Sequence, residues 1–287
     1  MKKSALFIVL ISFLFTINNA LAKQVSLKNT KVHYLKSSKN GINYRLYISL
    51  PKHYKTSKDS YPVVYLLDQD YSFAIAHNIF EHLSDRGFLQ EAILVAIGYT
   101  DQDKIPDYND KKSLSMYTLN RTRDYTPIST YKDNDYDDLH YKKSGNAAKF
   151  KAFIKDELFP FINQKYRTNE QKTIVGHSYG GLFVTWVYLT DGDMFNNYIA
   201  VSPSFWYKDR YIFSQIDKAK INQEAKLYMT VGLNETKRMI QGVREMAEIL
   251  KSDNVKTEFL ADENHSSIFA TGLTHGTQFC LKPKNRD

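Results

Sequence analysis

Cysteine, flexible linkers and long apolar runs are scarce in this sequence. Cys280 is the only cysteine among 287 residues, so no disulfide can form within the chain. No stretch rich in proline or serine interrupts the chain, and its length is near the upper limit for one hydrophobic core. These absences predict one domain that is stabilised by its apolar core rather than by cross-links.

The apolar run over residues 5–17 is too short to cross a membrane, because a spanning helix takes about 20 residues. Lys2 and Lys3 precede the run and Ala20-Leu21-Ala22 follows it, a small-x-small cleavage pattern with no lipid-attachment cysteine after it. We therefore predict a secretory signal peptide over residues 1–22 and a mature domain over residues 23–287. The expected location is periplasmic or secreted, with no stable membrane insertion after cleavage near Lys23.

A strong excess of one charge sign is also lacking. The formal charge is +8, and it falls to +6 when Lys2 and Lys3 are removed. Nucleic-acid binding would need a basic stripe or a known module, and the sequence has neither. No nucleic-acid partner is predicted.

One acidic cluster invites a calcium interpretation. Asp133, Asp135 and Asp137 occupy the first three odd positions of an EF-hand loop. That interpretation fails because Asp138 stands where the loop needs glycine, and Ser144 stands where it needs a bidentate glutamate. A solvated loop is the better interpretation, and neither a metal nor an organic cofactor is predicted.

Strand-like and helix-like segments alternate along the mature chain. Residues 31–35 and 43–50 alternate apolar and polar side chains, which predicts an edge hairpin. Further strands are predicted at residues 62–67, 92–98, 173–175, 198–201, 226–231 and 255–260, and helices at residues 74–86, 150–161, 182–189, 240–250 and near the C-terminus. This alternation predicts a mostly parallel sheet with helices on both faces.

A serine between glycines stands at the centre of the chain. Residues 172–183 read Lys-Thr-Ile-Val-Gly-His-Ser-Tyr-Gly-Gly-Leu-Phe, which predicts a strand, a sharp turn at Ser178 and a buried helix. The residues two before and two after such a serine must nearly lack side chains for strand and helix to approach, and Gly176 and Gly180 meet that demand. The alternative is an ordinary glycine turn in the core.

The carboxyl ends of the predicted strands carry Ser178, Glu235 and His265. Active sites in such sheets lie at these ends, and the order serine, acid, histidine is that of the α/β-hydrolases. A serine hydroxyl becomes an effective nucleophile when an imidazole takes its proton, and a carboxylate orients the imidazole. We predict Ser178 as nucleophile, His265 as base and Glu235 as acid, with Tyr179 and Gln69 giving backbone N–H groups to an oxyanion hole.

Each triad member has alternatives. His275 is the other histidine that follows Ser178, but it falls in the predicted last helix, and His177 is expected to point away from the serine into helix packing. A surface histidine or a surface glutamate is the simplest competing explanation of the other two positions. The other acids near the strand ends are Asp262, Glu263 and Asp209.

The pattern lapses between Tyr99 and Ser144, where we predict a lid insertion over residues 100–144. Arg121 and Arg123 offer planar cationic donors and the tyrosines offer aromatic faces, which suits an aromatic or anionic ester. The alternative is that the tyrosines only pack the lid and that Arg123 holds Asp124 or another carboxylate. The tyrosines concerned are Tyr108, Tyr117, Tyr125, Tyr131, Tyr136 and Tyr141.

Several motifs together resemble the esterase branch of the α/β-hydrolases that includes the esterase D-like proteins and the enterobactin and bacillibactin esterases. The resemblance covers nearly all of the mature chain. Its segments are Leu66-Leu67-Asp68, Arg123-Asp124-Tyr125-Thr126-Pro127, residues 153–162, Gly176-His177-Ser178-Tyr179-Gly180-Gly181, Ser202-Pro203-Ser204-Phe205-Trp206 and Asn264-His265-Ser266-Ser267.

The resemblance implies hydrolysis of a small-molecule ester, such as a catechol siderophore ester, with Ser178 as nucleophile and His265 as base. Trp206 and Arg123 are the candidates for substrate binding. Some relatives work as a serine and histidine pair without a clear acid, and relatives usually carry glycine where this sequence has Gln69. Acyl transfer by the same triad, or binding without catalysis on a hydrolase scaffold, are the competing functions.

Overall fold

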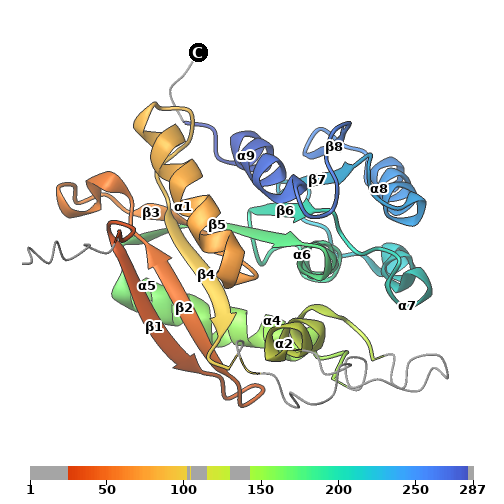
Figure 1. Cartoon of the computed structure of the whole chain (residues 1–287), viewed down its shortest axis with the longest axis horizontal. Coiled ribbons are helices and arrows are strands. Elements are labelled where there is room, and N and C mark those ends of the chain that lie inside the picture. The colour runs from red at the N-terminus through yellow and green to blue at the C-terminus, as the bar shows by residue number, and fades with distance from the viewer. Residues whose placement is uncertain (1–24, 102–103, 105–114, 130–142, 284–287) are drawn as a thin grey trace, which may run out of the picture.

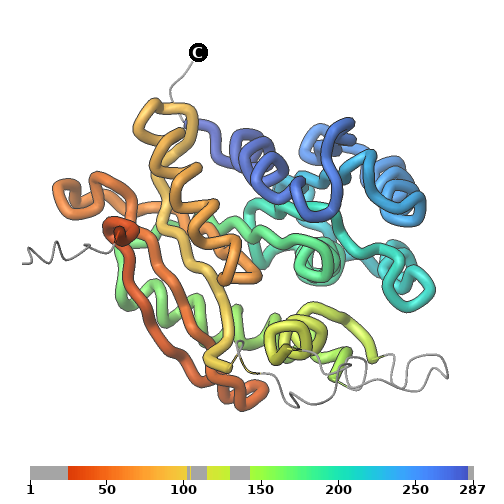
Figure 2. The backbone as a smooth tube through the Cα atoms, in the orientation of Figure 1, coloured from red at the N-terminus to blue at the C-terminus, as the bar shows by residue number. Residues whose placement is uncertain are grey.

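The computed structural model describes residues 25–101, 104, 115–129 and 143–283. A single eight-stranded sheet runs through this part of the chain (Figures 1 and 2), in the order β1-β2-β4-β3-β5-β6-β7-β8. The strands are β1 Thr30–Lys36, β2 Asn43–Ser49, β3 Tyr61–Leu66, β4 Ile93–Tyr99, β5 Thr168–His177, β6 Asn197–Val201, β7 Lys226–Gly232 and β8 Val255–Leu260.

The sheet is mostly parallel, as predicted. β1 and β2 form the antiparallel edge hairpin, β2 runs antiparallel to β4, and all remaining neighbours are parallel. In the central register Val175 of β5 pairs with Leu66 of β3 and with Ile199 of β6. Because these three strands end nearly level, the residues that follow them meet at one edge of the sheet.

Helices cover both faces of the sheet. α1 and α9 pack on one face around Leu66, Val175 and Ile199, and α4, α5, α6 and α8 pack on the other. The α-helices are α1 Gln69–Asp85, α2 Met116–Tyr125, α4 Ala147–Phe153, α5 Phe159–Lys165, α6 Tyr179–Thr190, α7 Tyr207–Arg210, α8 Lys237–Ile249 and α9 Ile268–Cys280. The 3₁₀ helices are η1 Lys52–Lys55 and η3 Tyr211–Lys218, and η2 Ile154–Leu158 is a π-helix. The chain therefore has the predicted α/β-hydrolase fold.

The predicted start of the first helix is wrong by five residues. α1 begins at Gln69 rather than at residue 74, because Asp68 adopts a left-handed conformation (φ 56°) that turns the chain sharply after β3. The first turn of α1 is polar, so it does not show the apolar periodicity that predicts a helix. Gln69 and Ser72 in this turn are nevertheless buried.

The predicted lid is not irregular throughout, since it contains helix α2. Sequence periodicity missed this helix because polar residues, Asn120, Thr122 and Asp124, fill its buried face beside Leu119 and Tyr125. α2 packs against α4 and α6, so it lies beside the serine turn. The acidic cluster at Asp133, Asp135 and Asp137 and the tyrosines Tyr108, Tyr131, Tyr136 and Tyr141 lie outside the described residues.

The signal-peptide prediction for residues 1–22 also lies outside the described residues. Within the part of the chain that the structure describes, the helices are too short or too polar for any of them to span a bilayer.

Candidate active site

Ser178 occupies a strained turn between β5 and α6. Its backbone has φ 60° and ψ −117°, a combination that L residues rarely adopt and that functional sites often retain. The Ser178 N–H donates to the carbonyl of Val201 at 3.0 Å, which fixes the turn to the end of β6. The turn thus holds the serine at the carboxyl edge of the sheet.

The three glycines around the serine turn differ in how much room the structure leaves for a side chain. A Cβ at Gly176 would lie 2.3 Å from the carbonyl oxygen of Gly180, so residue 176 must lack a side chain. A Cβ at Gly180 would meet nothing closer than 3.4 Å, so this position has room for an alanine. The tighter position is Gly181, where a Cβ would lie 3.0 Å from Val201 and Pro203 backbone atoms.

Glu235 and His265 form a pair between the loops that follow β7 and β8. Nδ1 of His265 lies 2.8 Å from Oε2 of Glu235, whose side chain is 1% exposed while that of the histidine is 43% exposed. The other carboxylate oxygen, Oε1, accepts from the Gly232 N–H at 3.0 Å and from the Ser202 hydroxyl. An ionised carboxylate only accepts hydrogen bonds, so Nδ1 carries the proton and Nε2 is left as a base.

Hydrogen bonds keep Glu235 ionised. Burial acts to raise the pKa of this carboxyl group, but the bonds from His265, Ser202 and the Gly232 N–H outweigh burial and lower the pKa below its ordinary value. The carboxylate is therefore charged at neutral pH and oriented by three donors.

The segment after β6 connects the serine to the acid. Ser204 Oγ lies 3.3 Å from Ser178 Oγ, and Ser202, with φ 42°, donates to Glu235. Among the described residues the Ser178 hydroxyl bonds Ser204 rather than His265. Neither Ser202 nor Ser204 was predicted as a site residue, although both lie just after a buried strand, as Ser178 does.

Ser178, Glu235 and His265 open on one pocket of about 400 Å³. Predicted Trp206 lines it, and so do several residues that were not predicted. The lining residues are Ser178, Ser204, Trp206, Asn234, Glu235, Thr236, Arg238, Met239, Asn264 and His265. The structure thus brings the predicted nucleophile, base and acid together with one predicted binding residue.

Arg123 does not reach this pocket, which corrects its predicted role in substrate binding. Its Nε and Nη2 donate to both oxygens of Asp124 at 2.7 and 2.9 Å, and Nη1 donates to Asn120 at 2.6 Å. The guanidinium therefore pairs with Asp124, its neighbour in the sequence. This pairing was the alternative interpretation of Arg123.

Arg121 is committed in the same way to the buried Asp68. Nε and Nη2 each lie 3.0 Å from an oxygen of Asp68, and Nη2 also lies 3.3 Å from the carbonyl of His177. The pair anchors α2 to the turn after β3 and to the residue before the serine.

The predicted oxyanion residues, Gln69 and Tyr179, are the first residues of helices α1 and α6. The Leu67 N–H donates to Val175 and the Asp68 N–H to the Tyr125 hydroxyl. The N–H of Gln69 is the first after β3 without a partner in the described part of the chain, while its side chain accepts from Arg45 at 3.2 Å. Tyr179 is the first residue of α6, and N–H groups in the first turn of a helix find no carbonyl partner within that helix.

His177 packs against helix residues as predicted, and it also contacts the base. Its ring lies 6.2 Å from that of Tyr71 and 6.0 Å from that of Phe269, but only 4.6 Å from that of His265. Burial and then the nearby His265 lower the pKa of His177 to about 4, so its ring is neutral at ordinary pH.

The alternative residues lie elsewhere. His275 bonds Glu258 at 2.8 Å, and Glu263 bonds Ser267 and Thr271. Asp209 lines a neighbouring cavity instead of the pocket of Ser178. Of the acids considered, Glu235 is the one that the structure joins to His265.

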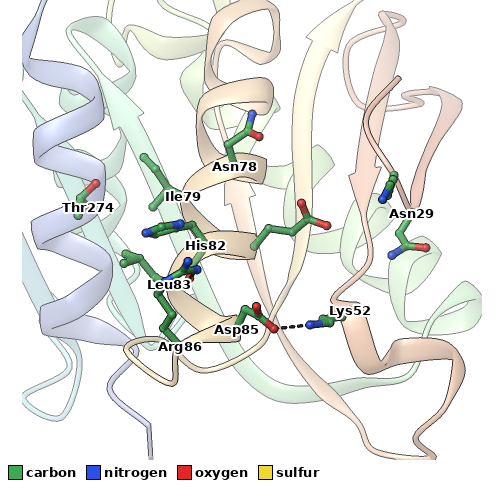
Figure 3. Close-up of a pocket in the computed structure, with 11 residues that line it drawn as sticks. Asn29, Lys52, Asn78, Ile79, His82, Leu83, Asp85, Arg86 and Thr274 are labelled. Atoms are coloured by element: carbon green, nitrogen blue, oxygen red, sulfur yellow. Dashed lines mark hydrogen bonds and ion pairs between the residues drawn. The ribbon is translucent and has the colours of Figure 1, made fainter. Parts of the chain in front are cut away.

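A larger cavity, of about 870 Å³, lies between α1, α9 and the chain before β1 (Figure 3). Its Asp85 is paired with Lys52, and Thr274 of α9 faces His82 and Leu83 across it. None of the predicted site residues lines this cavity, so size alone does not identify the active site. The described residues contain no group of three or more side chains suited to hold a metal ion.

Comparisons with known proteins agree with the fold. Residues 37–275 match the family described as "Putative esterase". The ferri-bacillibactin esterase of Bacillus subtilis is 28% identical over 285 residues, which cover 93% of this chain and 94% of that protein. The siderophore enterobactin esterase of Emericella nidulans is 29% identical over 82% of this chain and 88% of its own.

Solved structures give the same result. An IroE-like serine hydrolase from Shewanella oneidensis superposes with a TM-score of 0.76 at 26% identity, and the match covers 90% of this chain and 82% of that one. The match to the family covers most of the chain, the fold is the one this family shares, and the pocket holds a strained serine near a histidine and acid pair. The chain therefore belongs to this esterase family of the α/β-hydrolases and is a carboxylic ester hydrolase.

Proposed function

We propose that the protein hydrolyses esters through an acyl-enzyme formed on Ser178. The observation that carries this proposal is the His265 to Glu235 bond of 2.8 Å, which directs the free Nε2 of the imidazole away from the acid in a pocket shared with Ser178. The similar protein from Shewanella oneidensis is named a serine hydrolase, which supports the same chemistry.

In the first half-reaction His265 Nε2 takes the proton of the Ser178 hydroxyl as Oγ attacks the ester carbonyl. The carbonyl oxygen becomes negative and is stabilised by the N–H groups of Tyr179 and Gln69. His265 then gives its proton to the departing alcohol oxygen, and the acyl group stays on Oγ. Water repeats the sequence in the second half-reaction and releases the acid.

The hydroxyl of Ser178 turns from Ser204 toward His265 before it reacts. A rotation about χ1 moves Oγ between staggered positions, and catalytic hydrogen bonds commonly tighten only when the substrate is bound. Ser204 holds the hydroxyl in the resting state at 3.3 Å, a long bond that is easily exchanged.

The substrate class that we propose is the ester of a siderophore. The relatives from Bacillus subtilis and Emericella nidulans are named as esterases of bacillibactin and enterobactin, and the pocket offers the aromatic face of Trp206 beside the cationic Arg238. To test this class, kcat/KM is measured for a catecholate triester and for short aliphatic esters. A clear preference for the aliphatic esters would leave a general esterase.

A fluorophosphonate probe tests the nucleophile. One equivalent is expected to label the wild type, and Ser178→Ala is expected to abolish labelling. Ser214→Ala, which removes an exposed hydroxyl on η3, is the matched control and should label fully. An unlabelled wild type would favour a binding protein, and a labelled Ser178→Ala would place the nucleophile elsewhere.

His265→Ala is expected to lower kcat/KM by roughly a thousandfold or more. The double variant with Ser178→Ala should be little worse than either single variant, because the two residues act as one unit. Retention of more than about a tenth of the activity in His265→Ala, far above the usual effect of losing a triad member, would contradict the assignment.

A further inference from the structure

We propose that Arg238, stacked on Trp206 beside the Ser178 pocket, binds an anionic group on the ester substrate, either a carboxylate or a catecholate. The inference rests on the proposed function, because it concerns the arm of the ester that extends from the reacting carbonyl. It replaces Arg123, whose guanidinium is already bonded to Asp124.

The stacking of Arg238 leaves its hydrogen-bond donors available. Its Cζ lies 4.4 Å from the centre of the Trp206 ring, a cation–π contact that does not take the place of a hydrogen bond. The N–H groups of a guanidinium point outward in its plane, and two of them match the two oxygens of a carboxylate or a catecholate. Trp206 thereby restricts the side chain without using its donors.

Three other arginines are paired, whereas Arg238 has no ion-pair partner among the residues that the structure describes. Arg121 bonds Asp68, Arg123 bonds Asp124 and Arg210 bonds Glu245. In the described part of the chain no carboxylate lies within ion-pair distance of Arg238. An arginine that is held in place and unpaired at the edge of a reactive pocket is free to take an anion from the substrate.

The position of Arg238 is not explained by helix stability. The residue is in the first turn of α8, a turn that contains no acidic side chain. Cations are unfavourable at this end of a helix, where the backbone N–H groups give a partial positive charge. The partial positive charge at the N-terminus of α8 attracts an anion, and so does the guanidinium of Arg238.

Trp206 and Arg238 line two neighbouring cavities. The acidic residue that lines each cavity indicates which of the two would accept an anion. The second cavity, of about 440 Å³, is also lined by Asp209, whose carboxylate opposes a bound anion. In the pocket of Ser178 the carboxylate is that of Glu235, which is buried and already bonded to three donors. The anion is therefore expected on the side of Ser178.

The test uses two matched pairs of p-nitrophenyl or aryl esters. In one pair the acyl arm is 3-phenylpropanoyl or 3-(4-carboxyphenyl)propanoyl, and in the other the same carboxylate is present or absent on the alcohol arm. Wild-type enzyme, Arg238→Gln and Arg244→Gln are compared by kcat/KM. Arg244 is the matched control, since it lies on α8, is exposed and stacks on Phe259 at 4.9 Å, but lines neither cavity.

In at least one pair the wild type should prefer the anionic ester, and Arg238→Gln should reduce that preference about tenfold, the order expected for one charge-assisted contact. Arg244→Gln should keep the preference, and the neutral esters should be hydrolysed by all three proteins. Equal preferences in Arg238→Gln and Arg244→Gln for both pairs would overturn the inference. Failure of the proposed function would look different, because the neutral esters would then not be hydrolysed or would still be hydrolysed by Ser178→Ala.

Discussion

At the scale of single residues, three donors fix the carboxylate of Glu235. Its bonds to His265, Ser202 and the Gly232 N–H come from three loops at the carboxyl edge of the sheet. Its lowered pKa keeps it charged, and a charged acceptor holds the imidazole in the tautomer whose Nε2 can accept a proton. A substitution that removes the charge of Glu235 but keeps the shape of its side chain should therefore impair its role.

Glu235→Gln should slow kcat by roughly a thousandfold to ten-thousandfold, since an amide no longer favours the required tautomer or stabilises the imidazolium. The urea midpoint and near-ultraviolet circular dichroism should change little. Asp262→Asn and Asp209→Asn are the controls, and both should retain nearly full activity. A loss confined to either control would transfer the role of the acid to that residue.

Gly176→Ala should destabilise the protein by about 1–3 kcal/mol, the usual cost of overpacking, because the new Cβ meets the Gly180 carbonyl oxygen at 2.3 Å. Gly180→Ala should change the free energy of unfolding by less than about 1 kcal/mol, since alanine favours a helix and its nearest neighbour is 3.4 Å away. Urea unfolding measures both values. Equal losses of unfolding free energy in the two variants would show that the contact between residue 176 and the Gly180 carbonyl is not what excludes a side chain.

At the scale of elements, the junction of β3, α2 and the serine turn depends on a buried ion pair. Asp68 is fully buried and is held by Arg121 and by the Tyr71 hydroxyl at 3.2 Å. The Arg121 guanidinium also lies 5.7 Å from the ring centre of Tyr179, the residue after the serine. Loss of the arginine would leave a buried carboxylate poorly compensated.

Arg121→Met should therefore lower the free energy of unfolding by about 3–5 kcal/mol, as expected when one partner of a buried pair is removed. Addition of Asp68→Asn to this variant should recover part of the loss. Arg210→Met, which breaks an exposed pair with Glu245, is the control and should cost at most about 1 kcal/mol. Similar losses in the two single variants would mean that burial of Asp68 is not the cause.

A second junction joins β7, β8 and α9 through Glu258. The carboxylate accepts from the Tyr228 hydroxyl at 2.6 Å and lies 2.8 Å from His275 Nδ1 and 2.7 Å from Lys256 Nζ. Burial opposes ionisation, but these three partners lower the pKa of Glu258 to about 2. The position of His275, a rejected candidate base, is explained by this structural bond.

Because its pKa is lower in the folded state, Glu258 stabilises the fold above its ordinary pKa of 4.5, and this contribution is lost as the pH falls toward 2. The free energy of unfolding should therefore fall less steeply between pH 5 and about 3 in Glu258→Gln than in the wild type. Glu248→Gln, at an exposed site on α8, should keep the wild-type slope. Parallel slopes in all three proteins would contradict the role of Glu258.

At the scale of the whole molecule, we propose that the protein is exported and that its first 22 residues are removed. Lys2, Lys3, the apolar run over residues 5–17 and the small residues at 20 and 22 support this proposal. Expression of the full chain in a bacterial host should give a soluble extracytoplasmic protein whose N-terminal sequence begins at or near Lys23. Recovery of an intact N-terminus from the cytoplasm would contradict it.

The sequence by itself determined the strand order along the chain, the edge hairpin and the serine turn. These features depend on local patterns: alternating or continuous apolar side chains, and glycine beside a strained serine. Positions directly after strands pointed to Ser178 and His265, because parallel strands bring their carboxyl ends together. The same argument left Glu235, Asp262, Glu263 and Asp209 as candidate acids, and the 2.8 Å contact of Glu235 with His265 distinguishes among them.

Only the tertiary structure decided which polar side chains pair. Arg123 and Asp124 are adjacent on α2, and sequence neighbours on a helix do not usually face each other, so their bond could not be assumed. Arg121 and Asp68 are 53 residues apart, and Ser202 and Glu235 are 33 apart. Charge pairing depends on distance in space and on burial, which the order of residues does not specify. For this reason only the structure shows that Arg123 is paired and that Arg238 lines the pocket with no carboxylate partner among the described residues.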